Sequence, residues 1–486
     1  MVHRKQSSKR PQAKHKSSRQ SQFDKRERLN RPNPDRKRTV RARVPLVGAL
    51  KGLARSMSGV LDVRIAFRLS VIMAGIMLAD DRRVAAAWFA AAGVRDDWDR
   101  FYDCLVSIGR NTRSVAIPLL IAVVQKFDPG PDSHLTIAVD DSPTKRYGKH
   151  VEGAGVHHHP TPGPAEGEWL YGHNWVCLCL LASHPIWGVI ALPLLSMLYV
   201  RAKDVPPLKA KYGWEFRTKH ELAVDLVRWF VCTMRGLGIM CGIHLVVDGA
   251  YAARDIMSAM KEKGVVVFSR LRRDAVLFDL PPERTGQRGR PRIYGEHRIN
   301  IIKRAAHRQG WESITYRCRG ANVTRQYKSF LATSRLVGGV IRVVIVRFED
   351  GGWAAYFCTD PELTVRAILE TVAARWAVEE HFHDVKEVWG AGKQQVRNVW
   401  SNIACWQLNQ WMYTMIELCS WDTPQSDLTD RSDRPWDNPA RRPSHADRRR
   451  TFARQMLENR FFKALPKTPD FHKFRALVYD VISLCA

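Results

Sequence analysis

The sequence predicts an α/β protein with an N-terminal helical domain and a β-rich insertion, and three observations support this prediction. Residues 44–128 contain apolar segments with helical periodicity, of which VRIAFRLSVIMAGIML is the strongest. In residues 129–273, short apolar strands such as LTIAVDDS and HLVVDGAY alternate with helical segments, which is the pattern of an α/β core. Residues 274–358 hold successive strand-like runs, including VIRVVIVRF and WAAYFCT, and are therefore predicted to be an insertion rich in β-strands.

The remaining segments complete the predicted organisation. Residues 1–43 contain almost no apolar side chains, so we expect a disordered basic arm there. Helical patterns return in residues 359–421, which are expected to form the last part of the core. Residues 422–486 begin as a polar, proline-rich linker and end in a basic segment that we expect to be helical.

The charge of the chain indicates a polyanionic partner. The formal net charge is +29 and the pI is about 10.0. The arm of residues 1–43 holds 16 Lys and Arg against 3 acids, which leaves +16 on the rest of the chain. Because the excess extends beyond the arm, an extended anionic ligand such as nucleic acid is expected.

Other features argue against a secreted or membrane protein. The ten cysteines form no CxxC pairs, and the N-terminus has no apolar signal region, so a cytoplasmic location with reduced cysteines is expected. Residues 176–200 are long and apolar enough to suggest a membrane span. Ser183-His184-Pro185 interrupts this run, however, and two buried strands joined by a turn fit better. No membrane partner is therefore expected.

Acidic residues follow two of the predicted core strands. Asp140 and Asp141 end the first strand, and Asp248 ends a later one. Residues at the carboxyl ends of strands in an α/β sheet face the crevice where ligands bind. Carboxylate oxygens suit Mg²⁺ or Mn²⁺, and two such ions about 4 Å apart promote displacement at a phosphodiester. The alternative is that these acids only begin turns, as aspartate commonly does.

A third acid lies in the predicted helix RWAVEEHFHDVKEVWG. Helical geometry places Arg375, Glu379 and Lys386 within an arc of roughly 40° beside the apolar stripe. Glu380 points away from this arc and is expected to be solvated. The three charged residues can be interpreted as an ordinary surface ladder of i,i+4 pairs, or as a functional carboxylate between two cations.

At these residues the chain resembles the insertion-sequence DDE transposases that carry a Tyr-Arg-Glu-Lys signature. In that signature two residues separate Tyr from Arg, three separate Arg from Glu, and six separate Glu from Lys. Arg375, Glu379 and Lys386 match this spacing, whereas Val372 stands at the Tyr position. VVDGAY resembles the second-acid block of the family and identifies Asp248 as its acid.

AVDDSPTKRYGK resembles the first-acid block, with Ser142 where threonine is usual. The family pattern favours Asp140 as the first catalytic acid and leaves Asp141 as the alternative.

The resemblance implies an RNase H-like mixed-sheet core in which Asp140, Asp248 and Glu379 are both the catalytic residues and the ligands of two Mg²⁺ or Mn²⁺ ions. It also implies double-stranded DNA partners, namely element ends and target DNA, and a homodimer that pairs two ends. The residues expected to contact DNA are Arg375, Lys386, Arg288, Arg290, Arg270, Lys145 and Arg146.

The loop RTGQRGRPRIYG has two interpretations. Extended arginines of the Arg288-Gly289-Arg290-Pro291 type can lie in a narrow minor groove, and a solvated basic loop is the alternative.

The sequence as a whole predicts a DNA transposase of the insertion-sequence type. Such an enzyme cuts DNA strands by metal-dependent hydrolysis and joins the freed 3′-hydroxyl ends to target DNA. Two alternatives are an RNase H-like nuclease without strand transfer, and a domesticated DNA-binding protein that has lost catalysis.

Overall fold

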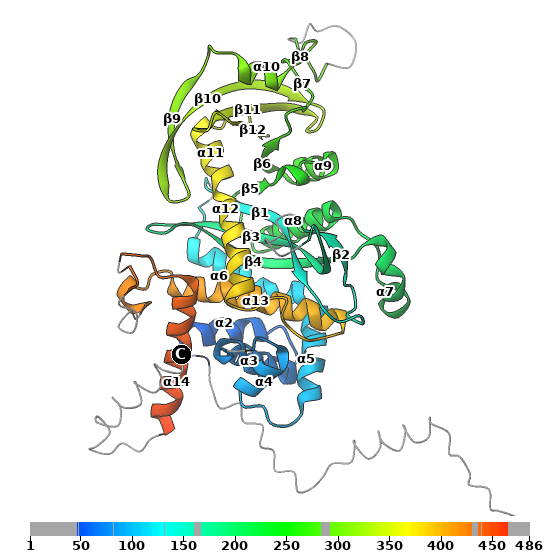
Figure 1. Ribbon diagram of the computed structural model, residues 1–486, viewed down its shortest axis with the longest axis vertical. Coiled ribbons are helices and arrows are strands. Elements are labelled where there is room, and N and C mark those ends of the chain that lie inside the picture. The colour runs from blue at the N-terminus through cyan, green and yellow to red at the C-terminus, as the bar shows by residue number, and fades with distance from the viewer. Residues whose placement is uncertain are drawn as a thin grey trace, which may run out of the picture. The chain divides into compact units, whose positions relative to one another are not determined.

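The protein is described here from a computed structural model, which is shown in Figure 1. The structure describes residues 46, 48–80, 82–130, 132–159, 167–282, 292–429, 436–438 and 440–464. Residues 42–486 form one compact unit. The predicted basic arm of residues 1–43 lies outside the described residues, and so do Arg288 and Arg290.

Five helices, α2 to α6, precede the first strand in the described residues. The Asp62 side chain caps α3 by accepting a hydrogen bond from the Arg64 main-chain N–H at 3.0 Å. At Gly109 in α5 the backbone passes so close to Trp400 of a later helix that a Cβ atom would lie 1.9 Å from the Trp400 carbonyl oxygen. Only glycine permits that approach, so the helical part packs directly on the rest of the unit. The helices are α2 (Gly48–Ser58), α3 (Val63–Leu78), α4 (Ala85–Ala91), α5 (Trp98–Arg110) and α6 (Thr112–Phe127).

The described residues contain one mixed sheet of twelve strands, and this confirms the predicted mixed α/β class. Its main path runs β2-β3-β1-β5-β6-β12-β11-β10-β7-β8, while β4 pairs with β3 and β9 pairs with β10. Strands β1, β5 and β6 are parallel, and β3 is antiparallel to both β1 and β4. The first six strands are β1 (His134–Lys145), β2 (Gly155–His158), β3 (Trp169–His184), β4 (Gly188–Tyr199), β5 (Gly242–Val247) and β6 (Val265–Leu271).

The β-rich segment predicted as an insertion extends this same sheet. β12 pairs antiparallel with β6, with Tyr356 opposite Arg270, so the later strands continue the ladder of the earlier ones. Periodicity predicts strands but not their partners, because an edge strand offers its free hydrogen bonds to any segment that reaches it. The segment comprises β7 (Leu277–Phe278), β8 (Arg298–Ile299), α10 (Ile301–Ala306), β9 (Glu312–Cys318), β10 (Ala321–Ser334), β11 (Gly339–Arg347) and β12 (Trp353–Cys358).

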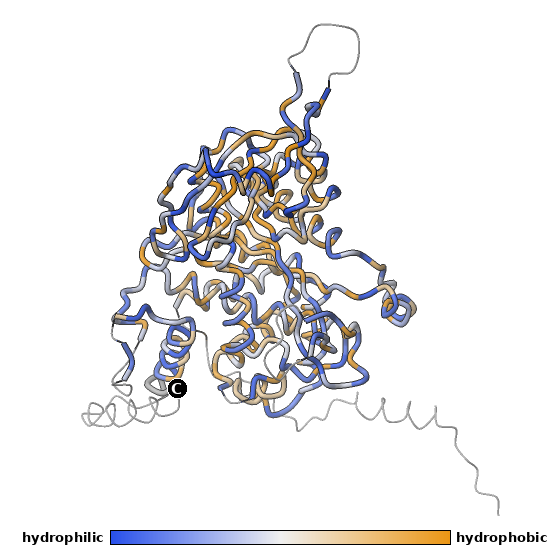
Figure 2. Tube along the Cα trace, turned by 45° about the horizontal axis from the view of Figure 1, so that its top comes forward, coloured by the Kyte–Doolittle hydropathy of each residue, from blue (hydrophilic) through white to orange (hydrophobic). Residues whose placement is uncertain are grey.

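The apolar run at residues 176–200 forms a buried hairpin, as predicted. It makes up most of β3 and β4, whose residues are almost all buried, and the turn between the strands follows His184. Among the described residues, no helix has the length and apolarity needed to cross a membrane. Figure 2 shows that hydrophobic residues concentrate along the strands and the helices that pack against them.

The remaining helices cover the sheet, and one of them, α13, is buried along almost its whole length. Nearly every residue of α13 is buried, from Val399 to Ser420. The predicted apolar stripe of the Glu379 helix is also confirmed, because Val378, Phe382 and Val385 are buried. These helices are α7 (Val205–Tyr212), α8 (Lys219–Gly236), α9 (Arg254–Lys263), α11 (Val365–Ala374), α12 (Trp376–Glu387), α13 (Val399–Ser420) and α14 (His445–Ala464); short 3-10 turns are η1 (Ala202–Asp204), η2 (Gly249–Tyr251) and η3 (Gln425–Asp427).

Candidate active site

Two of the predicted acids lie side by side on parallel strands. Val139 of β1 pairs in register with Val247, the last residue of β5. Asp140 directly follows Val139, and Asp248 directly follows Val247, so the two aspartates occupy neighbouring positions on the sheet. The prediction that Asp140 and Asp141 end their strand is wrong, because β1 continues to Lys145 in its pairing with β3. The two distant aspartates are neighbours because the parallel pairing of β1 with β5 stops at Val139 and Val247.

Arg375 links the third acid to the first. Its guanidinium lies between two carboxylates, with Nη1 2.6 Å from Asp140 Oδ2 and Nη2 3.3 Å from Glu379 Oε1. Arg375 stands between α11 and α12, and Glu379 lies one helical turn further along α12. The shared guanidinium of Arg375 therefore links Glu379 to Asp140, while the Glu379 side chain stays 46% exposed.

Burial dominates the electrostatics of Asp140. The pKa of the Asp140 carboxyl is raised from 3.8 to about 7; loss of solvent is the largest cause, and the charges of Asp141 and Glu379 add to it. The Arg375 guanidinium and a hydrogen bond from the Asp141 main-chain N–H, at 2.8 Å, oppose this rise without cancelling it. Asp140 is thus a carboxylate whose charge the protein leaves under-compensated, as is common in functional sites.

The adjacent glutamates of α12 have different partners, as the helical phase predicts. Glu379 pairs with Arg375, whereas Glu380 lies 3.7 Å from Arg442, a partner that touches neither aspartate. Both glutamates are exposed, so their partners, and not their burial, distinguish them.

Besides Arg375, two further predicted cations lie near the acids. Lys386 is half-buried on α12, and its pKa is lowered chiefly by burial, against the opposing charges of Cys177, Glu387 and Glu379. Arg270 is exposed on β6, and the Gly249 backbone beside Asp248 passes close to it: a Cβ atom on Gly249 would lie 3.9 Å from the Arg270 Cβ. Arg270 is thus placed to meet an anion next to Asp248.

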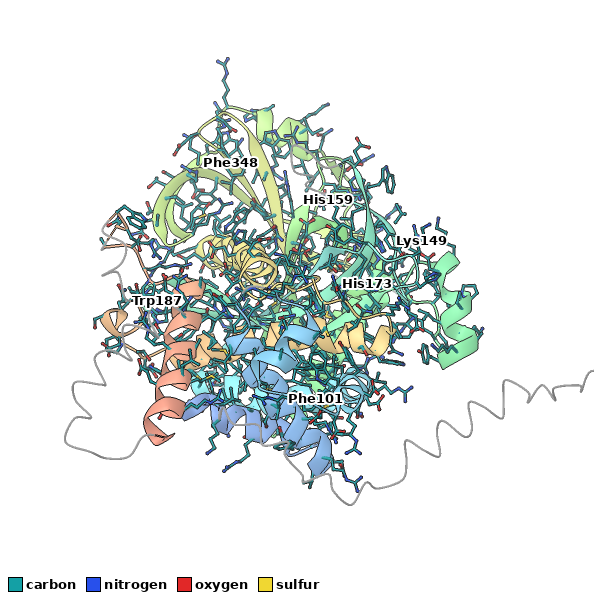
Figure 3. The ribbon with its side chains drawn as sticks, turned by 60° about the horizontal axis from the view of Figure 1, so that its bottom comes forward. Phe101, Lys149, His159, His173, Trp187 and Phe348 are labelled. Carbon is teal, nitrogen blue, oxygen red and sulfur yellow. The ribbon has the colours of Figure 1, made fainter. Side chains whose placement is uncertain are left out.

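Arg146 differs from its prediction as a DNA contact. It is only 7% exposed, and its Nη1 donates hydrogen bonds to the main-chain carbonyls of Gly392 at 2.7 Å and Gln394 at 2.6 Å. Its Nε donates to Nδ1 of the fully buried His173, which is labelled in Figure 3. The guanidinium therefore holds the chain after α12 against β1 and does not face an external phosphate. The neighbouring Lys145 is exposed.

Asp141 points to the other face of β1. Successive side chains of a strand alternate between faces, and Asp141 accordingly contacts Lys219 of α8 and Tyr251 of η2 in place of α12. Neither partner was singled out in the sequence. Tyr251 could have been noticed, since it lies three residues after Asp248 in VVDGAY, but Lys219 carries no comparable signal.

The carboxylates have the chemistry of a hard-metal site, but they are not gathered as a preformed cluster. Asp140, Asp248 and Glu379 offer only oxygen donors, which suits Mg²⁺ or Mn²⁺. Within the described residues, however, no three His, Cys, Asp or Glu side chains are arranged to hold a metal ion. The Arg375 guanidinium binds one carboxylate oxygen of Asp140 and one of Glu379. The donor set thus fits a divalent cation in kind, and such a cation would compete with Arg375 for two of the three acids.

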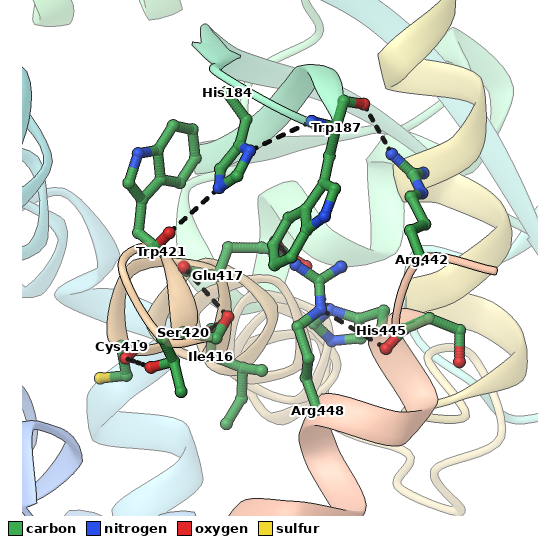
Figure 4. Close-up of polar contacts among 12 residues, drawn as sticks. His184, Trp187, Ile416, Glu417, Cys419, Ser420, Trp421, Arg442, His445 and Arg448 are labelled. Carbon is green, nitrogen blue, oxygen red and sulfur yellow. Dashed lines mark hydrogen bonds and ion pairs between the residues drawn. The ribbon is translucent and has the colours of Figure 1, made fainter. Parts of the chain in front are cut away.

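A second carboxylate–arginine cluster lies between α13 and α14 (Figure 4). Glu417 is fully buried; one carboxylate oxygen binds the Arg448 guanidinium, and the other accepts a hydrogen bond from His445 Nδ1 at 2.5 Å. The Trp389 indole N–H donates to His445 Nε2 at 2.8 Å, so Nδ1 carries the ring proton. The pKa of Glu417 is lowered: burial is the largest effect and raises it, but Arg448 and His445 together outweigh it.

Comparison with known proteins gives one family match. Residues 64–328 match the family model described as "DDE superfamily endonuclease", and this match covers more than half of the chain. It includes Asp140 and Asp248 and ends before Glu379. No curated protein matches the chain.

Among solved structures, the chain is similar to a piggyBac transposase in a synaptic complex with hairpin DNA. The TM-score is 0.34 and the sequence identity 10%, over 73% of this chain and 57% of the piggyBac chain. This chain therefore matches little more than half the length of that protein, and a TM-score at this level carries no argument about fold or function.

Proposed function

This chain belongs to the DDE superfamily endonuclease family, and from that premise we propose that it is a DNA transposase of the insertion-sequence type. It would bind the ends of its own element, cut the DNA strands there, and join the freed 3′-hydroxyl ends to target DNA. We propose Asp140, Asp248 and Glu379 as the catalytic acids.

One observation carries this proposal. Three acids from separate sequence blocks come to one edge of the sheet, with Asp140 beside Asp248 and Glu379 tied to Asp140 through Arg375. The strand order β4-β3-β1-β5-β6, with β1, β5 and β6 parallel, supports an RNase H-like core around them. Of the two adjacent aspartates, Asp140 is preferred because it alone shares a cation with Glu379.

The residues around the acids suit a phosphodiester substrate. Asp140, Asp248 and Glu379 would hold Mg²⁺ or Mn²⁺, which would supply an activated attacking oxygen and stabilisation of the leaving oxygen. Arg270 lies on β6, the strand next to β5, and would bind a phosphate of the DNA strand that is cut at the acids. Arg375 would bind a phosphate once it releases Asp140, and the overall net charge of +29 would attract the duplex.

The test uses the full chain with a plasmid that carries the DNA flanking its coding sequence on both sides. We expect nicking in Mg²⁺ or Mn²⁺, loss of nicking with EDTA, and joined products when target DNA is added. Asp248→Asn should lower nicking by orders of magnitude while DNA binding persists. Asp255→Asn, which alters an exposed aspartate on α9, is the matched control and should cut like the parent.

The outcomes separate the three candidate functions. Nicking without joined products would identify a nuclease that lacks strand transfer. Binding without nicking, in the parent as well as in Asp248→Asn, would identify a DNA-binding protein without catalysis. Equal nicking by Asp248→Asn and the parent would contradict the proposed site.

A further inference from the structure

The second aspartate of the pair, Asp141, has both of its carboxylate oxygens engaged. Tyr251 donates its hydroxyl to Asp141 Oδ1 at 2.8 Å, and Lys219 donates from Nζ to Oδ2 at 2.6 Å. The pKa of Tyr251 is raised well above its usual value, mainly by burial and then by the Asp141 charge, so the phenol is neutral and acts as the donor. Asp141 is therefore a hydrogen-bond acceptor with no oxygen left unpaired.

Tyr251 connects Asp141 to the segment that carries Asp248. Its ring is 2% exposed, and its main-chain N–H donates to the Asp248 carbonyl at 2.9 Å, which closes the tight turn η2 directly after Asp248. In the described residues the Asp248 carboxylate has no hydrogen bond or ion pair of its own. Its position is thus set by the backbone, and the backbone is anchored to β1 by the Tyr251 hydroxyl.

The first turn of α8 holds the same segment from another side. Lys219 reaches Asp141, and the ring of His220 lies beside that of Tyr251, tilted at 59°, with Nε2 3.0 Å from the Ala250 carbonyl oxygen. A capping box between Thr218 and Glu221 fixes where this helix begins. Helix α8, turn η2 and strand β1 therefore meet at the Asp141 carboxylate.

From this geometry we propose that Asp141 is a positioning residue that sets the placement of Asp248 relative to Asp140. Its carboxylate holds η2 through the Tyr251 hydroxyl, and its main-chain N–H orients the Asp140 carboxylate through the 2.8 Å hydrogen bond. The proposal rests on the proposed function, because it takes Asp140 and Asp248 as the acids that bind the metal. It assigns Asp141 a role distinct from that of a metal ligand or first catalytic acid.

The experiment compares Tyr251→Phe, Asp141→Ala, Asp141→Asn and the double variant Asp141→Ala/Tyr251→Phe. For each, Mn²⁺ affinity is measured by electron paramagnetic resonance and by calorimetry, nicking is measured in the same buffer, and circular dichroism confirms folding. Tyr327→Phe is the matched control, since Tyr327 donates to Glu312 at 2.5 Å on strands that do not pair with β1 or β5. Asp140→Asn is the reference for loss of a direct ligand.

Partners behind metal ligands typically contribute 10- to 100-fold to metal affinity or activity, so we expect Tyr251→Phe and Asp141→Ala each to weaken Mn²⁺ binding and nicking by about 10-fold or more. The double variant should lose no more than Asp141→Ala alone, because Asp141→Ala already removes the hydrogen bond from Tyr251. Asp141→Asn should recover most of the loss, since an amide oxygen still accepts the Tyr251 hydroxyl. Tyr327→Phe should behave like the parent.

Two results would overturn the positioning role. One is an Asp141→Asn variant that loses Mn²⁺ as completely as Asp140→Asn while Tyr251→Phe binds normally, since that pattern identifies Asp141 as a ligand. The other is parental affinity and nicking in both Tyr251→Phe and Asp141→Ala. The proposed function fails separately, if Asp140→Asn itself leaves Mn²⁺ binding and nicking intact.

Discussion

Asp140 and Glu417 are both largely buried carboxylates paired with arginine, yet their pKa values are shifted in opposite directions. Glu417 is fully buried, but Arg448 and His445 engage both of its oxygens and lower its pKa. Asp140 keeps a little solvent access, shares its arginine with Glu379, and has its pKa raised to about 7. The difference lies in how completely each charge is compensated, not in how deeply it is buried.

This comparison separates a carboxylate with a structural role from one that we propose to be catalytic. The Glu417 cluster joins α14 to α13 with every charge matched, so removing one member leaves another without a partner. At the Asp140 site a single guanidinium serves both Asp140 and Glu379, so the negative charge is less completely matched, and a metal ion could displace Arg375. Such incomplete compensation costs stability and is common where function requires it.

The largest expected effect on stability is that of Glu417→Gln. The substitution leaves Arg448 buried without a counter-charge, and breaking a buried pair in this way typically costs about 3–5 kcal/mol. The measurement is the free energy of unfolding by urea. Glu380→Gln, which removes an exposed acid 3.7 Å from Arg442, is the matched control. A loss no larger than that of the control would show that the Glu417 cluster does not hold α14 in place.

Asp140→Asn should change the free energy of unfolding in the opposite direction and stabilise the protein. Because the native pKa of Asp140 is raised, its ionised form destabilises the fold at neutral pH, and a neutral amide removes this cost. Arg375 keeps Glu379 as a partner. We expect a gain of about 0.5–2 kcal/mol in the free energy of unfolding at pH 7.5, as found when strained functional residues are replaced. A clear loss of stability would mean that Asp140 is compensated as well as Glu417 is.

The pH dependence of the two variants should also diverge. The lowered pKa of Glu417 means that its contribution is fully present above its unfolded pKa, near 4.5, and is lost as pH falls through its lower folded value. The raised pKa of Asp140 means that the parent loses stability as pH rises from about 3.8 to about 7. The melting-temperature gain of Asp140→Asn should therefore grow across that interval. A gain that is constant from pH 4 to pH 8 would contradict the raised pKa.

The smallest effect is expected for Glu380→Gln. Substitution of an exposed acid usually changes stability by less than about 0.5 kcal/mol, because solvent already screens its charge. Thermal unfolding of this variant beside the parent checks the value. A loss above 1 kcal/mol would show that the Arg442 contact matters more than its exposure suggests.

Local patterns predicted the parts of the molecule that depend on local geometry. The stripe of Val378, Phe382 and Val385 followed from the helical repeat, and the β3–β4 hairpin followed from Pro185 within an apolar run. The sequence also anticipated that Asp140 and Asp248 are neighbours, but it placed Asp140 at the end of its strand, whereas β1 continues to Lys145.

Features that depend on distant partners were not predictable in the same way. Arg146 looks like a surface cation in its own segment, and its burial depends on carbonyls some 246 residues later. Glu417 lies in an apolar helix, and its partners follow a proline-rich linker 28 and 31 residues away. The pairing of β12 with β6 was likewise not predictable, because the hydrophobic periodicity of a strand does not determine which strand it pairs with.

The adjacent glutamates of α12 test the central claim most directly. Glu379→Gln and Glu380→Gln change the same chemical group on neighbouring residues of similar exposure, and only Glu379 is linked to Asp140. Both variants would be compared with the parent in one Mg²⁺- and Mn²⁺-dependent nicking assay on DNA that carries an element end. We predict that Glu379→Gln abolishes nicking while Glu380→Gln retains most of the parental rate. An active Glu379→Gln beside an inactive Glu380→Gln would contradict the assignment of Glu379 as the third catalytic acid.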